Sequence, residues 1–192
     1  EAMQEKVVTY GGKSFPLEQP FFVLATQNPI DQEGTYSLPE AQLDRFMFNI
    51  WVDYPSFNEE VEVIKRTTSN RSVSINQVLS VEEIQDYQQA IKSIPVADNV
   101  IEYAVNLVSK TRLSRDHSSD LAKKYLSWGA GPRASQYLII AAKTNAALNG
   151  KLSPDIEDVK QVALPILRHR IMLNYKADSE GLKAEHFIQQ IL

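Results

Sequence analysis

The stretch that decides the fold lies near the N-terminus: FFVLATQNPIDQEGTYSLPEAQLDRF, residues 21–46. Its first five residues, Phe21–Ala25, form a continuous apolar run that ends abruptly in polar residues. Continuous rather than alternating apolarity favours a strand buried on both faces, as in the parallel sheet of an α/β domain. Phe46–Val52 is predicted to be another strand, so the N-terminal part of the chain has α/β character.

A β-hairpin is predicted ahead of this stretch. Lys6–Tyr10 and Lys13–Leu17 are short strand-like runs on either side of Gly11-Gly12. Two such runs around Gly-Gly favour a tight primed turn. Leu38–Leu43 is predicted to be a short helix that starts at its proline. Because Glu1–Glu5 is typical of the last turn of a helix, we interpret the chain as a fragment that begins inside a domain.

Helical patterns dominate from residue 56 onward. Ser56 with Glu59, and Ser80 with Glu83, have the spacing of a capping box, in which each side chain satisfies a backbone N–H of the other. Asp98 is predicted to cap the next helix, and Ser153-Pro154 to cap a later one. A helix is also predicted to open at Gly131-Pro132 and to close at Gly150, with two more over residues 165–172 and 183–192.

The composition is ordinary for a globular chain and excludes several kinds of site. Of the 192 residues, 43% are hydrophobic and 23% charged, so a core can form without covalent cross-links. The absence of cysteine excludes disulfides, cysteine zinc sites and thiol catalysis. A net charge of −4 argues against a broad nucleic-acid-binding face. The longest apolar runs are far too short to span a membrane.

Asn28 is the first candidate functional residue. It follows the predicted strand Phe21–Ala25 directly, and ligands of open α/β sheets bind beyond the carboxyl ends of the strands. An amide at that place could orient a water molecule or a phosphate. The alternative is structural, because Asn28-Pro29 is a common start of a turn.

Arg45 is the second candidate. It stands between a short predicted helix and a predicted strand, where its side chain can project from the surface. A guanidinium there could reach a phosphate on a neighbouring subunit and offset the charge of a transferring phosphoryl group. The alternative is a local ion pair with Asp44 or Glu40.

Arg133 is the third candidate, because its place in the predicted helix is electrostatically unfavourable. It follows Pro132 in the first turn, where the helix dipole disfavours a cation, and no Asp or Glu is near in sequence. This arrangement suggests an anionic ligand shared with the helix N-terminus. The alternative is a solvated arginine that tolerates a small penalty.

Other catalytic and ligand-binding patterns are absent from the sequence. His117, His169 and His186 have no metal-ligand spacing, and His169 is predicted to lie on a solvated or interfacial face. No GxSxG, HExxH or GxxxxGK[ST] motif occurs. Five aromatic side chains are predicted to belong to the core rather than to a stacking platform for nucleic acid: Tyr87, Tyr103, Tyr125, Trp128 and Tyr137.

Taken together, these segments resemble the MoxR family of AAA+ ATPases. The resemblance rests on residues 1–5, the hairpin, the stretch ATQNPIDQEGTY, the stretch LPEAQLDRF, and later on GPRAS at 131–135 and LRHR at 167–170. It implies a fold of two parts. Residues 1–70 would be the C-terminal part of the α/β ATPase core with its β-hairpin insertion, and residues 71–192 would be the helical lid domain.

The resemblance also implies roles for the three candidates. Asn28 matches the sensor-1 residue, which positions the attacking water. Arg45 matches the arginine finger, which acts on the nucleotide of the neighbouring subunit. Arg133 matches the sensor-2 arginine, which reports the nucleotide state to the lid, in cis or in trans. The Walker A and Walker B motifs of the family are not present in these residues.

The implied parent protein is an ATPase that uses ATP and Mg²⁺ and couples hydrolysis to the remodelling or maturation of partner proteins. The resemblance implies a cytoplasmic ring oligomer, a hexamer in many members, and clients that include proteins with von Willebrand factor A domains. The chain alone is expected to be inactive and to bind no nucleotide tightly. The alternative is a non-catalytic interaction or oligomerisation module of AAA+ origin. Nucleic-acid binding is a weaker third possibility.

Overall fold

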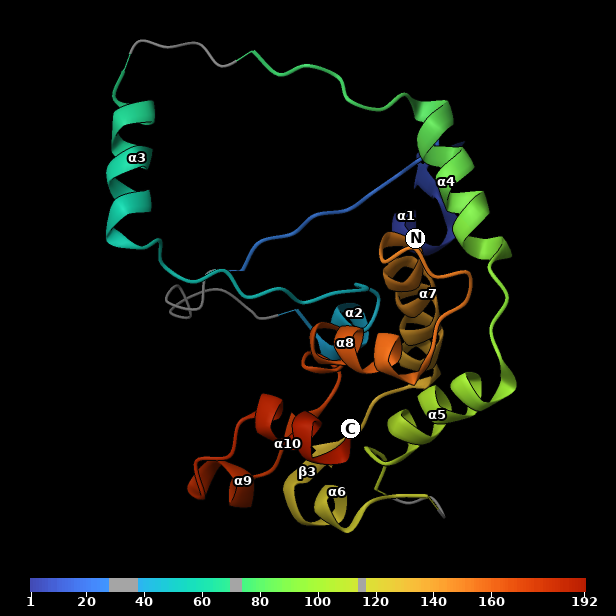
Figure 1. Ribbon diagram of the computed structural model, residues 1–192, viewed down its shortest axis with the longest axis vertical. Coiled ribbons are helices and arrows are strands. Elements are labelled where there is room, and N and C mark those ends of the chain that lie inside the picture. Colours follow the sequence, from blue (N-terminus) through green and yellow to red (C-terminus); the bar gives the residue numbers. More distant parts are fainter. Residues whose placement is uncertain (28–37, 70–73, 114–116) are drawn as a thin grey trace.

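A computed structural model describes residues 1–27, 38–69, 74–113 and 117–192 (Figure 1). The elements follow one another as α1 (Ala2–Glu5), β1 (Val7–Tyr10), β2 (Lys13–Pro16), α2 (Glu40–Leu43), α3 (Phe57–Thr67), α4 (Val81–Ser93), α5 (Asp98–Ser109), α6 (Asp120–Tyr125), β3 (Leu126–Trp128), α7 (Pro132–Leu148), α8 (Ile156–Leu167), β4 (Met172–Leu173), α9 (Tyr175–Ser179) and α10 (Ala184–Ile191).

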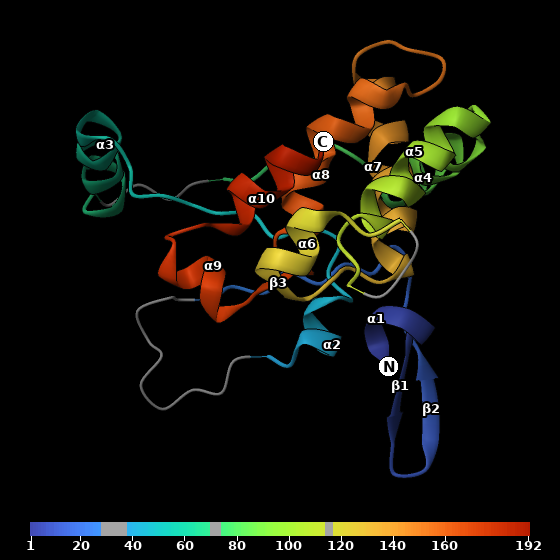
Figure 2. The same ribbon diagram turned by 90° about the horizontal axis from the view of Figure 1, so that it is seen from below.

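The hydrophobic core lies in the C-terminal helices. Its fully buried side chains include Leu107 on α5, Leu138 on α7, Ile166 on α8 and Phe187 on α10. Helix α7 packs against α4, α5 and α8, and the antiparallel pair β3–β4 lies beside α6 and α9. Helix α3 stands apart from the other helices in both views (Figures 1 and 2). The buried core therefore belongs to the lid-like part of the chain.

The predicted hairpin is confirmed. Strands β1 and β2 pair antiparallel, with Val7 opposite Pro16 and Tyr10 opposite Lys13. Gly11 and Gly12 both have positive φ, at 57° and 75°, as a primed two-residue turn requires. Figure 2 shows the hairpin projecting away from the helices.

The strands predicted over Phe21–Ala25 and Phe46–Val52 are not formed. Among the described residues, strand pairing is confined to β1–β2 and β3–β4. The two predicted strands run without regular structure, and Phe22 and Leu24 are 79% and 84% exposed. Apolar runs report a tendency to be buried, but a strand also needs a hydrogen-bonding neighbour, which the described residues do not supply.

Both predicted ends of α7 are confirmed. Gly131 is the N-cap and Pro132 occupies the first helical position. At the other end Gly150 has a φ of 72°, its N–H donates to the carbonyl of Ala147, and the N–H of Lys151 donates to the carbonyl of Ala146. This is the Schellman arrangement, in which a left-handed glycine satisfies the last carbonyls of a helix. The site below depends on this well-defined helix.

The capping boxes predicted at Ser56 and Ser80 are also confirmed, at the starts of α3 and α4. Two other predicted caps are wrong. Asp155, not Ser153-Pro154, caps α8 and accepts from the N–H of Asp158 at 3.0 Å, because the Ser153 hydroxyl instead donates to the carbonyl of Pro95. The N-cap of helix α5 is Ala97, so Asp98 lies within the first turn of the helix instead of capping it.

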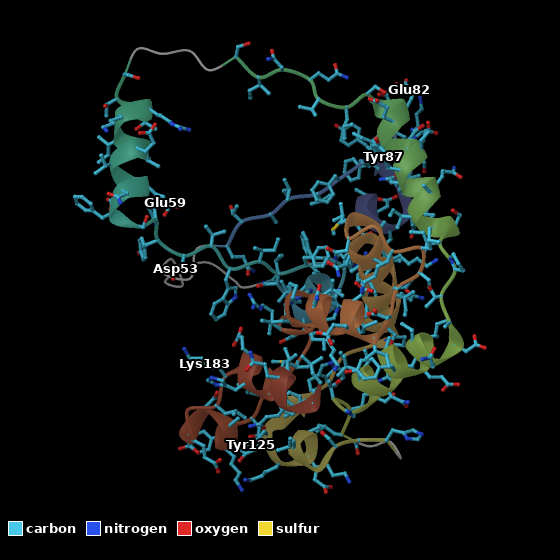
Figure 3. The ribbon with its side chains drawn as sticks, in the orientation of Figure 1. Asp53, Glu59, Glu82, Tyr87, Tyr125 and Lys183 are labelled. Atoms are coloured by element: carbon cyan, nitrogen blue, oxygen red, sulfur yellow. The ribbon has the colours of Figure 1, made fainter. Side chains whose placement is uncertain are left out.

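The prediction that the aromatic side chains belong to the core is wrong for two of them. Tyr87 on α4 and Trp128 on β3 are 59% and 64% exposed, and Figure 3 shows Tyr87 on its helix.

The described helices include none long and apolar enough to cross a membrane.

Candidate functional site

The structure describes two of the three predicted site residues, Arg45 and Arg133. Asn28 lies outside the described residues. Arg45 follows α2 directly and is partly buried, and Arg133 is the second residue of α7. Asp44, the neighbour of Arg45 in sequence, forms an ion pair with Arg133. The site therefore forms where the end of α2 meets the start of α7.

Asp44 holds one arginine with each carboxylate oxygen. Its Oδ2 accepts from the guanidinium of Arg133, and its Oδ1 accepts from Nε of Arg170 at 2.9 Å. The side chains of Asp44 and Arg133 are 26% and 29% exposed, so both ion pairs are partly shielded from water. The anion expected near Arg133 is thus supplied by the fold, from a residue 89 positions earlier. The alternative for Arg45, a local ion pair with Asp44 or Glu40, is not formed among the described residues, and Asp44 instead bonds Arg133 and Arg170.

Tyr137 makes a second contact between α7 and this turn. Its hydroxyl donates to the backbone carbonyl of Arg45 at 3.1 Å, and its ring lies 5.1 Å from the guanidinium of Arg170. Tyr137 and Arg133 are one helical turn apart and so lie on the same face of α7. Side chains on that face therefore bond the carboxylate of Asp44 and the backbone carbonyl of Arg45.

Loop 129–131 sets the position of Arg133. A Cβ on Gly129 would lie 2.1 Å from the backbone carbonyl oxygen of Thr111, so this close approach requires glycine. The N–H of Ala130 donates to the Thr111 hydroxyl at 2.9 Å, and Arg112 donates to the Ala130 carbonyl at 3.1 Å. These contacts fix the entry into α7 against the end of α5.

Arg170 anchors the segment that follows α2. Its side chain is 1% exposed, and its guanidinium donates to four backbone carbonyls, those of Asp44 (2.9 Å), Phe46, Met47 (3.2 Å) and Ile166. A guanidinium suits this task because it presents five donors in a rigid plane. Arg170 stands in the LRHR stretch at 167–170, and its role as an anchor was not predicted from the sequence.

His169 and Arg168 extend the same anchor. His169 Nε2 lies 3.0 Å from the Phe46 carbonyl, and the Arg168 guanidinium lies 5.0 Å from the centre of the Trp51 ring. Of the two alternatives predicted for His169, a solvated or an interfacial face, the contact with Phe46 fits the interfacial one. Burial, with the charge of Arg170 adding to it, lowers the pKa of His169 from 6.5 to about 4. The ring is neutral at neutral pH, so Nε2–H donates to the carbonyl.

The last carbonyls of α8 also have hydrogen-bond partners, one of which comes from the segment that follows α2. The carbonyl of Pro165 accepts from the backbone N–H of Asn49 at 2.8 Å, and that of Ile166 accepts from Arg170. The carbonyls of Leu164 and Leu167 accept from backbone N–H groups within the turn that follows. Asn49 thus caps one of the last carbonyls of α8, and the carbonyls of residues 44–47 hold Arg170, which caps another.

An open cavity of about 480 Å³ adjoins the start of α7, lined by residues that include Glu40, Asp44, Trp128, Gly131 and Arg170. Arg133, partly exposed beside it, fits a phosphate oxygen as an anionic partner. In the described part of the chain, no three His, Asp or Glu side chains gather in a way that could hold a metal ion. Arg133 is thus a described cation beside this cavity that a phosphate could reach.

Two family models match the chain. The model described as "ATPase family associated with various cellular activities (AAA)" matches residues 1–48, and that of the AAA lid domain matches residues 118–191. Among curated proteins, the chain is similar to the chaperone MoxR1 of Mycobacterium tuberculosis, at 39% identity over 192 residues. It is also similar to the uncharacterised protein YeaC of Bacillus subtilis, at 38% over 193 residues.

The chain matches AAA family models in its N-terminal and C-terminal parts and is similar to MoxR proteins along its whole length. Both alignments cover all of it but only 51% and 58% of the relatives, so the chain spans about half of their length. Its fold matches the crystal structure of a candidate ATPase from Cytophaga hutchinsonii, with a TM-score of 0.90 and 39% identity over 99% of this chain and 58% of the other. The expected fold class, part of an AAA core followed by a helical lid, is confirmed.

Proposed function

We propose that this chain supplies the sensor and lid portion of an ATPase that couples ATP hydrolysis to the remodelling of partner proteins. One observation carries the proposal. A single carboxylate, that of Asp44, joins Arg133 at the start of α7 to the residue pair that contains Arg45. Arg133 held by this carboxylate, with Arg45 next to Asp44 in a chain similar to MoxR proteins, suits the recognition of phosphate charge at a subunit boundary.

Each candidate then has a separate task. Arg45 offsets negative charge on the transferring phosphoryl group of a neighbouring subunit's nucleotide, and Arg133 contacts a phosphate and ties the lid to it. Asn28 orients the attacking water. Mg²⁺, when bound with ATP, neutralises phosphate charge. Since the sequence contains no GxxxxGK[ST] motif, we assign the binding of phosphate and metal to residues beyond these 192, and the chain alone would not hydrolyse ATP.

The proposal includes the organisation of the assembly. We place the boundary between the core and lid portions after residue 70. The working form is a ring oligomer in the cytoplasm, with clients that include von Willebrand factor A-domain proteins. The relative named as a chaperone supports a remodelling role.

The test uses the full-length protein. Arg45→Ala should lower kcat about 100-fold while nucleotide binding by isolated subunits survives, because a finger contributes to the transition state of the neighbouring site. Arg133→Ala should lower turnover and weaken the response of the lid to nucleotide in hydrogen exchange. Arg66→Ala is the control, since Arg66 is exposed on α3 and pairs only locally, with Glu62. Wild-type turnover in both Arg45→Ala and Arg133→Ala would refute the proposal.

A non-catalytic interaction module is the second candidate. Exposed apolar side chains along 21–24 and 48–54, such as Phe22, Leu24 and Trp51, favour it, because unpartnered apolar side chains mark contact surfaces. Calorimetry of this chain with ATP and Mg²⁺, beside light scattering, separates the possibilities. Micromolar binding would contradict our assignment of the phosphate-binding residues. No binding, together with full activity of Arg45→Ala in the full-length protein, would support the module.

A further inference from the structure

We propose that Asp44 is a positioning residue that couples Arg133 to Arg45. In this role its carboxylate competes with nucleotide phosphate for Arg133, and the same ion pair holds the backbone of Arg45 in place. The inference rests on the proposed function and adds a residue to it.

The first step is the two-point contact between α7 and the Asp44-Arg45 pair. Arg133 bonds the carboxylate of Asp44, and Tyr137, one turn later on the same face, donates to the carbonyl of Arg45 at 3.1 Å. Because helices move as rigid bodies, a shift of α7 must either carry the backbone of Arg45 with it or break both contacts. The position of Arg45 is therefore linked to the position of the helix that carries Arg133.

The second step is the unequal burial of the two partners of Asp44. Arg170 binds Oδ1, is 1% exposed, and also holds the carbonyls of Asp44, Phe46 and Met47. Arg133 binds Oδ2 and is 29% exposed. One oxygen thus has a fixed partner, and the other has a partner that solvent and ligands can reach. The exchangeable contact is the one to Arg133.

The third step is competition between anions. Phosphate and carboxylate oxygens bind a guanidinium through the same N–H donors. A phosphate that takes Arg133 must share or replace its bond to Asp44. Asp44 therefore opposes the binding of nucleotide at Arg133, while its ion pair keeps Arg45 in position for turnover. A residue with these two effects has a kinetic signature that a purely structural residue lacks.

Asp44→Asn in the full-length protein tests this signature. The amide can still accept from Arg170, but it carries no charge to hold Arg133. We expect KM for ATP to fall about three- to tenfold, because the competing anion is gone, and kcat to fall about tenfold, because Arg45 is less well placed. In an Arg133→Gln background the fall in KM should vanish, since no guanidinium remains to be competed for.

Asp53→Asn is the matched control. Asp53 lies in the same connecting segment, is exposed, and accepts only from the N–H of Tyr54 among the described residues (Figure 3). It should leave KM and kcat at wild-type values. If circular dichroism shows that Asp44→Asn does not fold, Asp44→Glu carries the test, because it keeps the charge but moves it by one methylene, and the same opposite changes are expected at smaller size.

The outcomes separate this inference from the proposed function. An unchanged or raised KM in Asp44→Asn, with kcat lowered, would mean a purely structural role and overturn the inference, as would a lowered KM with unchanged kcat. Loss of turnover in Arg45→Ala and Arg133→Ala would leave the proposed function intact in either case. Wild-type turnover in those two variants would refute the proposed function itself.

Discussion

Acid should destabilise this chain through His169, and the effect can be calculated. The unfolded chain binds a proton on this ring below about pH 6.5, whereas the folded chain binds it only near pH 4. Between these values the unfolded state holds more protons, so the free energy of unfolding falls as the pH is lowered. The difference of about 2.5 pH units corresponds to roughly 3.4 kcal/mol. Because His169 is only partly buried, screening by water reduces this to about 2 kcal/mol.

The assay is urea unfolding of this chain at about pH 7.5 and about pH 5, compared with His169→Gln. Glutamine can still donate to the Phe46 carbonyl but has no charge to gain. The wild type should lose about 1.5 kcal/mol more than the variant over this interval. His186→Gln is the control, because His186 is exposed on α10. Equal losses in wild type and His169→Gln would refute the argument from burial.

Three further substitutions test the packing around the site. Arg170→Met should cost about 3–5 kcal/mol in urea unfolding, because the Asp44 carboxylate and several carbonyls lose their buried partner; a cost under about 1 kcal/mol would contradict the anchor. Gly129→Ala should cost about 3 kcal/mol from the clash with the Thr111 carbonyl, whereas Gly131→Ala, which meets open space and changes only the N-cap of α7, should cost about 1 kcal/mol or less in thermal melts of both variants. Ser80→Ala should cost about 1 kcal/mol and speed hydrogen exchange in the first turn of α4, and unchanged exchange would count against the cap.

Turns and helix ends that depend on residues close together in the sequence could be predicted from it. The turn at Gly11-Gly12, the capping boxes at Ser56 and Ser80, and both ends of α7 each depend on contacts within a few positions. Local chemistry decides these structures, so local patterns report them. The strand at Phe21–Ala25 was predicted wrongly, because its pattern contains no information about a pairing partner.

The chemistry of the site depends on contacts that no local pattern contains. Asp44 and Arg170 are 126 positions apart, and Arg133 has no acidic neighbour in sequence. The unfavourable position of Arg133 did indicate a missing anion, but not which residue supplies it. The signal for Asp44 was its place beside Arg45, and the signal for Arg170 was the basic tripeptide at the end of α8, 168–170. A sequence shows that such charges need partners, and only the fold assigns them.

The contacts of Asn49 with the Pro165 carbonyl, and of Arg170 with the carbonyls of residues 44–47, have a consequence for any attempt to dissect the chain. A lid portion that starts after residue 70 would contain all of the buried core. It would, however, lack Asn49, which donates to the Pro165 carbonyl, and the carbonyls of Asp44 and Met47, which accept from Arg170. Such a piece should unfold more readily than one that starts at residue 38, although both contain the same helices from α4 onward. The cooperative unit of this chain therefore reaches back across the boundary that its sequence suggests, and the segment beside Arg45 should lose its protection in the same step as the end of α8.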